Sequence, residues 1–187
     1  MTTNNAPLKK QAGSAVIEFP FVVFALMVVL WGLVAAYRLF NLQTQLDNVT
    51  YNLVNAVSLT QLKPDQASNG LPNSLKNQLL VLAERYLPHN IDPGNIGLSL
   101  ESRVFNTAAS NWEYKHIHAG INCQSDTPPI EKLKALIVEG SGDPALDGRP
   151  STLVQLTLCV NTPFDYKRLD LPKTLSSSSA VIGKHYG

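Results

Sequence analysis

The first chemistry that the sequence offers lies near its N-terminus, where one acidic side chain precedes a long apolar stretch. Glu18 is followed by segment 19–37, which contains no charged residue and no serine, threonine, asparagine or glutamine. A carboxylate at the edge of such a segment is costly in a membrane unless something compensates it. It can lie at headgroup depth, interact with the positive end of a helix dipole, or pair with a cation.

Pairing with a cation becomes available if the chain is cut after Gly13. Ser14 would then carry a new, charged N-terminal amine. Ser14 and Glu18 are four residues apart, so they lie on one face of a helix. The spacing predicts an ion pair between this amine and the Glu18 carboxylate, of the same chain or of a neighbour, which would favour ordered assembly in lipid.

The other reactive side chains are two cysteines and a pair of histidines. Cys123 and Cys159 do not have the CxxC spacing of redox or zinc motifs. They are expected to form a structural disulfide in an oxidising compartment and to remain free thiols in the cytosol. His116 and His118 could share one face of a strand, but no third ligand follows at a useful spacing. We therefore expect no metal and no cofactor.

Composition excludes further classes of protein. The net charge is +1 and no part of the chain forms a basic stripe, so a nucleic-acid partner has no electrostatic basis. No set of serine, histidine and acidic residues can be selected as a catalytic site, and we expect the protein not to be an enzyme.

The apolar stretch must position Glu18, and its length suits a membrane. A helix over 14–37 would be about 36 Å long, against about 30 Å for a bilayer core. Lys9 and Lys10 precede it and Arg38 follows it, which favours a cytoplasmic N-terminus and an exported remainder. An alternative is a secretory signal peptide cleaved after Ala36, but the apolar run is long for one and contains an acid at its start.

The helix is expected to continue beyond the membrane as an amphipathic extension over 38–62. Apolar residues there recur at spacings of three and four. This stripe consists of Leu39, Leu42, Leu46, Val49, Leu53 and Ala56. It could pack against the chain's own domain or against a partner helix, and the sequence leaves both open.

The remainder, 73–187, is expected to be a small domain of mixed helices and antiparallel strands. A helix should begin at Asn73 or Ser74 and end at Pro88. Alternation of apolar residues predicts strands over 96–105, 112–117 and 152–160. Apolar residues on one helical face predict a short helix over 130–139. Residues 176–179, four serines, are expected to be flexible. The fold class is therefore α+β, a long N-terminal transmembrane helix followed by this domain.

The N-terminal pattern resembles the processing site of type IV prepilins. It combines the basic residues Lys9 and Lys10 with Gly13, Glu18 at the fifth position after it, and an apolar helix from Phe19 onward. The resemblance implies that a prepilin peptidase cuts between Gly13 and Ser14. The sequence Gly-Ser-Ala-Val-Ile-Glu-Phe is most similar to the TadE/TadF pseudopilins of tight-adherence (Flp, type IVb) pilus systems, and the length and late cysteines are more similar to TadF.

Two departures bear on the role that this resemblance implies. Major Flp pilins carry Glu-Tyr after the cleavage site, whereas this chain has Glu18 and Phe19, and they are much shorter. The resemblance thus implies a minor pilin or pseudopilin needed for pilus assembly, in the filament or assisting its assembly. It would lie in the bacterial inner membrane, with the N-terminus cytoplasmic and the domain periplasmic.

The partners implied are the prepilin peptidase, other pilins and pseudopilins, inner-membrane pilus assembly proteins and membrane lipid. The alternative from another class is a single-pass, membrane-anchored periplasmic binding or scaffold module that is never cleaved.

Overall fold

The computed structural model describes residues 15–60, 73–89, 91–106, 109–123, 128–140, 148–162 and 173–186. The expected cytoplasmic prepilin-like leader, 1–13, and Ser14 lie outside this part of the chain. Two compact units result, Met1–Asn41 and Leu42–Gly187. The first is the N-terminal portion of helix α1, which runs from Ala15 to Thr60 as one helix.

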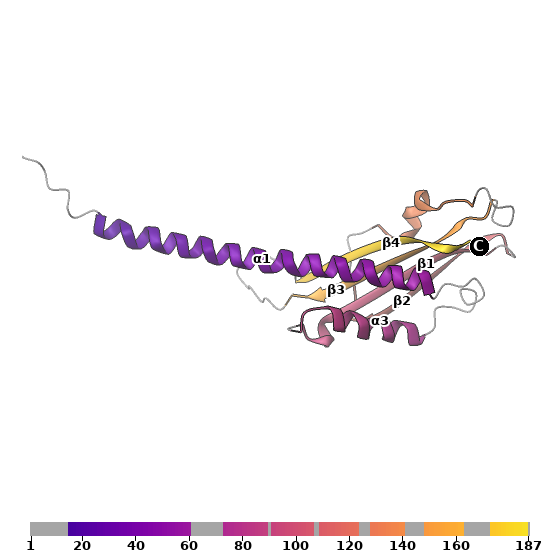
Figure 1. Cartoon of the computed structure of the whole chain (residues 1–187), viewed down its shortest axis with the longest axis horizontal. Helices are drawn as coiled ribbons and strands as arrows, with labels where there is room; N and C mark the ends of the chain where they lie inside the picture. The colour runs from indigo at the N-terminus through magenta and orange to yellow at the C-terminus, as the bar shows by residue number, and fades with distance from the viewer. Residues whose placement is uncertain are drawn as a thin grey trace, which may run out of the picture. The chain divides into compact units, whose positions relative to one another are not determined.

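The second unit is built on a four-stranded antiparallel sheet (Figure 1). Its strands lie in the order β2-β1-β3-β4, and each neighbouring pair is antiparallel. The strand bounds are Ile96–Asn106 for β1, Asn111–Gly120 for β2, Ser151–Asn161 for β3 and Thr174–Tyr186 for β4. The predicted strands are present, each with somewhat wider bounds, and the α+β class is confirmed.

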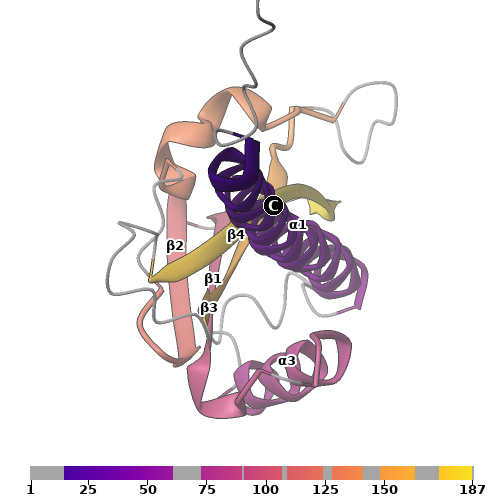
Figure 2. The same ribbon diagram turned by 90° about the vertical axis from the view of Figure 1, so that its left-hand side faces the viewer.

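Two helices cover one face of this sheet, which we call the core face. Residues 42–60 of α1 and helix α3, Asn73–Tyr86, lie on the same side of the strands (Figure 2). Their buried residues include Leu46 and Leu79, which join Leu98 and Leu156 of the central strands in one apolar core. The core face thereby acquires the packed apolar layer that a small domain needs.

The amphipathic stripe of α1 is used within the domain, with one change at its end. Leu42, Leu46, Val49 and Leu53 are buried and Leu39 is half-buried, but Ala56 is exposed and Val57 is buried in its place. Ala56 does not pack in this domain, and its expected part in helix packing stays a prediction. A straight helix drifts by about 20° per heptad from a 3.5-residue repeat, so the buried positions move along to Val57.

The strand β4 was not expected. Residues 176–179 lie in its middle and pair with residues 156–159 of β3. The expectation of a flexible polar segment was wrong because serines can line an antiparallel strand when their hydroxyls find partners. Ser178 shows this: its Oγ lies 2.9 Å from Nε2 of Gln155 and 3.0 Å from Oγ1 of Thr157.

The opposite face of the sheet, which we call the back face, is covered in part by a short 3-10 helix, η2. It spans Ile130–Leu136, shorter than the predicted helix, and follows Pro128 and Pro129. Its first residue, Ile130, is fully buried, whereas its last residue, Leu136, is exposed. As a result β3 is buried at every position from Ser151 to Val160.

Candidate functional site

Glu18 is placed by the start of α1. It lies in the first turn of the helix, where backbone N–H groups lack intrahelical partners and the dipole favours a negative charge. Its side chain is exposed, as is that of Phe19. Gly13 and Ser14 lie outside the described residues, so the predicted ion pair is not visible.

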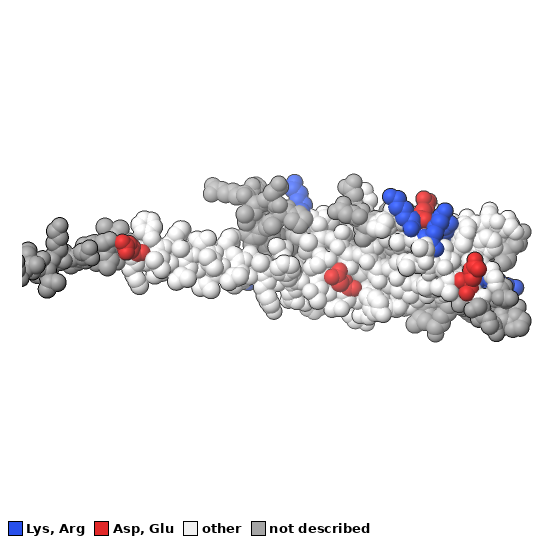
Figure 3. All heavy atoms as spheres, turned by 90° about the horizontal axis from the view of Figure 1, so that it is seen from above, with Lys and Arg blue, Asp and Glu red and all other residues white. Residues whose placement is uncertain are grey.

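The helix that follows Glu18 exposes apolar side chains on all sides up to Asn41. Each of the following is more than half exposed: Phe19, Phe21, Val22, Phe24, Leu26, Met27, Val28, Val29, Leu30, Trp31, Leu33, Val34, Tyr37 and Phe40. Figure 3 shows an unbroken length of this helix without a charged group. Leaving that surface in water would forgo on the order of 20 kcal/mol of burial, more than the net stability of a typical domain.

That surface therefore requires cover by lipid or by protein. Among the described residues, α1 is the one helix that is long and apolar enough to cross a membrane. The chain is thus suited to single-pass anchoring through its N-terminal helix.

In the domain, the chain crosses the back face immediately after β2. Gly120, Gly97 and Cys159 lie in one row across β2, β1 and β3. Gly120 has φ +74°, and a Cβ at Gly120 or Gly97 would clash with the backbone carbonyl of Ile96 or Ile121 respectively. Only glycines let the chain turn and pass this close to β1. We call the segment 120–123 with Gly97 and Cys159 the crossover.

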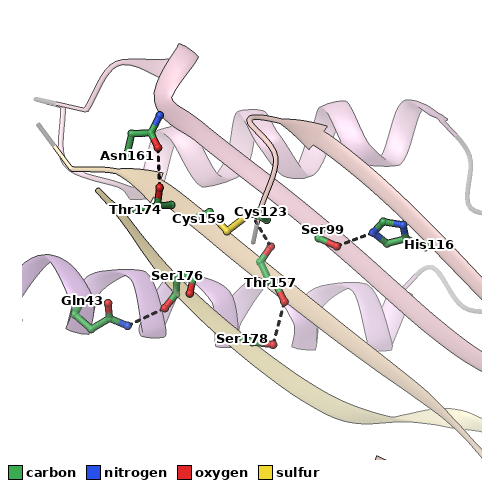
Figure 4. The surroundings of a disulfide bond; sticks show 10 residues. All are labelled: Gln43, Ser99, His116, Cys123, Thr157, Cys159, Asn161, Thr174, Ser176 and Ser178. Carbon is green, nitrogen blue, oxygen red and sulfur yellow. Dashed lines mark hydrogen bonds between the residues drawn. A yellow bond between two sulfur atoms is a disulfide. The ribbon is translucent and has the colours of Figure 1, made fainter. Parts of the chain in front are cut away.

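The crossover ends in a disulfide between Cys123 and Cys159 (Figure 4). The two Cα atoms are 5.5 Å apart, and Cys159 is fully buried on β3. Sγ of Cys123 also lies 4.0 Å from the carbonyl oxygen of Thr157. The bond joins the segment after the edge strand β2 to the central strand β3, so it spans β1.

Beside the crossover is a shallow hollow of about 490 Å³ lined by histidines. Nε2 of His116 lies 2.8 Å from Oγ of Ser99, and the rings of His116 and His118 are stacked with centroids 5.9 Å apart. In the described part of the chain, no group of three or more histidine, cysteine, aspartate or glutamate side chains could hold a metal ion. The two imidazoles thus remain a pair on one strand face.

Further along the back face, a polar network attaches η2 to the sheet. Glu101 accepts hydrogen bonds from the Ile130 N–H at 3.2 Å and from the Tyr114 hydroxyl. Burial of that hydroxyl, followed by the negative charge and hydrogen bond of Glu101 and the charge of Glu131, raises the pKa of Tyr114 to about 12. Tyr114 is therefore a neutral donor at any physiological pH.

A second attachment of η2 uses Arg103. Its Nη1 donates to the Glu131 carbonyl oxygen at 3.3 Å, and its guanidinium lies 4.6 Å from the ring centroid of Trp112. Together, Glu101 and Arg103 fix η2 over the sheet by charge-assisted hydrogen bonds. Sequence reasoning missed both residues, although alternation along β1 places them on the face opposite Leu98 and Leu100 and could have flagged them.

These arrangements suit anchoring and packing. The described residues form an exposed apolar helix, a crossover fixed by a disulfide, and a polar network that attaches the short helix η2 to the sheet.

Comparison with known proteins bears on the whole chain. A family model named TadF, with the description "Putative tight adherence pilin protein F", matches residues 7–184. No curated protein and no solved structure matches the chain. The match includes the N-terminal helix, β1 to β3, most of β4 and both cysteines.

Proposed function

Because this chain belongs to the TadF family of tight adherence pilin proteins, we propose that it is a minor pilin or pseudopilin needed to assemble a tight-adherence pilus. In this proposal a prepilin peptidase cuts it after Gly13. It is a structural, non-enzymatic component that works by helix packing and through its exported domain, together with other pilins and inner-membrane assembly proteins.

The observation that carries the proposal is the first turn of α1. Glu18 is the last charge before the exposed apolar stretch, and it lies one turn after the proposed cleavage point. Cleavage would create an amine at Ser14 four residues from the carboxylate, where opposite charges on a helix interact. In a lipid environment either charge alone is expensive, so pairing between neighbouring helices would favour assembly over dispersed subunits.

The proposed location is the bacterial inner membrane, with a cytoplasmic N-terminus and a periplasmic domain. Lys9 and Lys10 against Arg38 give the charge bias expected for that orientation. The disulfide between Cys123 and Cys159 supports it independently, because such bonds persist in the periplasm and are rare in the cytosol.

N-terminal sequencing of the protein from bacterial membranes tests the processing step. A mature chain starting at Ser14 is expected. An intact N-terminus at Met1 or Thr2 would contradict processing and would favour the uncleaved, membrane-anchored scaffold module. Replacement of Gly13 by alanine should block cleavage, and a chain that is still shortened by thirteen residues would refute the assigned site.

A separate experiment tests the role of the Glu18 carboxylate. Glu18→Ala is expected to be inserted and cut but to lose pilus assembly, because the new amine loses its partner. Glu18→Asp, which keeps the charge, is the matched control and should retain part of the activity. Normal pili on cells that carry Glu18→Ala would remove this role.

A further inference from the structure

Among the described residues, the domain sheet ends in two edge strands, β2 and β4, which differ in their chemistry. The β2 edge carries Glu113 and Lys115, whereas β4 contains no charged residue and no proline over 174–183. An edge strand presents unpaired N–H and C=O groups, and natural sheets usually protect it with charge, proline or a bulge. Among the described residues, Gln43 of α1 donates to the Ser176 carbonyl oxygen of β4, and the remaining uncharged part of β4 can pair with another strand.

The direction of the β4 backbone groups follows from its ladder with β3. Hydrogen-bonded and non-hydrogen-bonded pairs alternate in an antiparallel ladder, and Thr162 N–H donates to the Lys173 carbonyl oxygen at 2.8 Å. Counting from that pair, the β4 residues whose groups point away from β3 are Thr174, Ser176, Ser178 and Ala180. Gln43 of α1 agrees with this count, since its Nε2 donates to the Ser176 carbonyl oxygen at 3.2 Å (Figure 4).

The same count applies to the other edge. Ile121 N–H donates to the Ile96 carbonyl oxygen at 3.1 Å, which fixes the alternation between β1 and β2. The β2 residues that point outward are Trp112, Tyr114, His116, His118 and Gly120. On both edges the outward residues carry their side chains on the back face, so joining the two edges would continue both faces of the sheet.

Strand direction also permits this junction. Three successive antiparallel pairings make β2 antiparallel to β4. A second copy displaced by translation alone, as neighbours anchored in one membrane can be, therefore presents an antiparallel β2 to β4. Pairing of β4 with β4, or of β2 with β2, would instead require a half-turn of one copy.

We infer that the β4 edge pairs with the β2 edge of a second, identically oriented copy of this chain. Strand direction favours this occupant, because a copy in the same orientation presents an antiparallel β2 to the β4 edge. The contact is heterologous and does not close, so copies can add in a row. The inference rests on the proposed single-pass orientation and is independent of cleavage after Gly13.

A proline at Ala180 tests the edge directly. Ala180 N–H points away from β3, so Ala180→Pro removes a donor from the edge and spares the ladder within the domain. Ala180→Val, which keeps the N–H, is the matched control. In full-length chains reconstituted in lipid bilayers, the proline variant should lower self-association about tenfold or more, and the valine variant should associate like the original chain.

Cross-linking identifies the partner strand. The photoreactive residue p-benzoylphenylalanine replaces the exposed His118 in a mixture of isotopically light and heavy full-length chains. Light-to-heavy cross-links that map to 174–183 are expected, and Ala180→Pro should abolish them. The inference is overturned if cross-links map elsewhere or are absent, if Ala180→Pro leaves them unchanged, or if this edge captures a different protein in cells. None of these results would alter the N-terminal sequence that tests cleavage.

Discussion

Removal of the disulfide gives a quantitative test of how the crossover holds the domain together. We consider the double variant Cys123→Ala/Cys159→Ala, because alanine leaves no unpaired thiol and adds no polar group at the fully buried Cys159. The bond closes a loop with a sequence separation of 36 residues. Loss of the bond should therefore act mainly on the unfolded chain, because it raises the conformational entropy of that state.

For a loop of this size, the chain-entropy relation gives about 4 kcal/mol of stabilisation at 25 °C. Truncation of the fully buried Cys159 side chain adds a smaller penalty, because the space that its sulfur fills is left empty. A loss of about 4 kcal/mol is large against the 5–15 kcal/mol that stabilises a typical domain. The variant should fold only marginally.

Urea unfolding in detergent micelles can measure this change. The chain has two tryptophans, and Trp31→Phe leaves Trp112 on β2 as the sole indole reporter of the sheet. Dithiothreitol should lower the free energy of unfolding of the original cysteine-containing chain by a similar amount, and it should not affect the double variant. A loss below about 1 kcal/mol in both experiments would refute the assigned role of the closed loop.

Two further predictions concern the two faces of the sheet. Leu46→Ala should lower the free energy of unfolding by about 2–5 kcal/mol, because Leu46 is fully buried in the core. Tyr51→Ala, on the exposed side of α1, is the control and should change the free energy of unfolding by less than about 0.5 kcal/mol. Equal losses for the two variants in urea unfolding would contradict packing of α1 on its own domain. The pKa of Tyr114, raised to about 12 from 10.0, predicts stability that is intact below pH 10 and falls as the pH rises toward 12. Tyr114→Phe should remove this part of the pH dependence, and identical alkaline unfolding curves for the two chains would count against it.

Much of the core face could be predicted from sequence because its pattern is strongly periodic. Leu98 and Leu100 alternate with polar or small residues in β1, and β3 shows the same period with Leu156 and Leu158. Four of the six stripe residues of α1 are buried, whereas Ala56 is exposed because the assumed heptad period differs from the period of a straight helix. Local periodicity thus determines which residues face inward.

The back face and β4 were harder to predict, because the hydrogen bonds that hold their residues in place come from partners distant in sequence. Ser178 is held by Gln155 and Thr157, more than twenty residues away. Glu101 reaches the Ile130 N–H, which is equally remote. Gly97 and Gly120 show no periodic signal, because the need for glycine arises only where another segment crosses.

The position of Cys159 in the chain gives the disulfide a place in the order of folding. Synthesis proceeds from the N-terminus, so β1 and β2 can pair as a local hairpin while one edge of β1 is still open. Cys123 is synthesised before its disulfide partner Cys159, which lies on β3. The disulfide therefore cannot form before the chain has been made as far as β3, and β4 becomes available only after that.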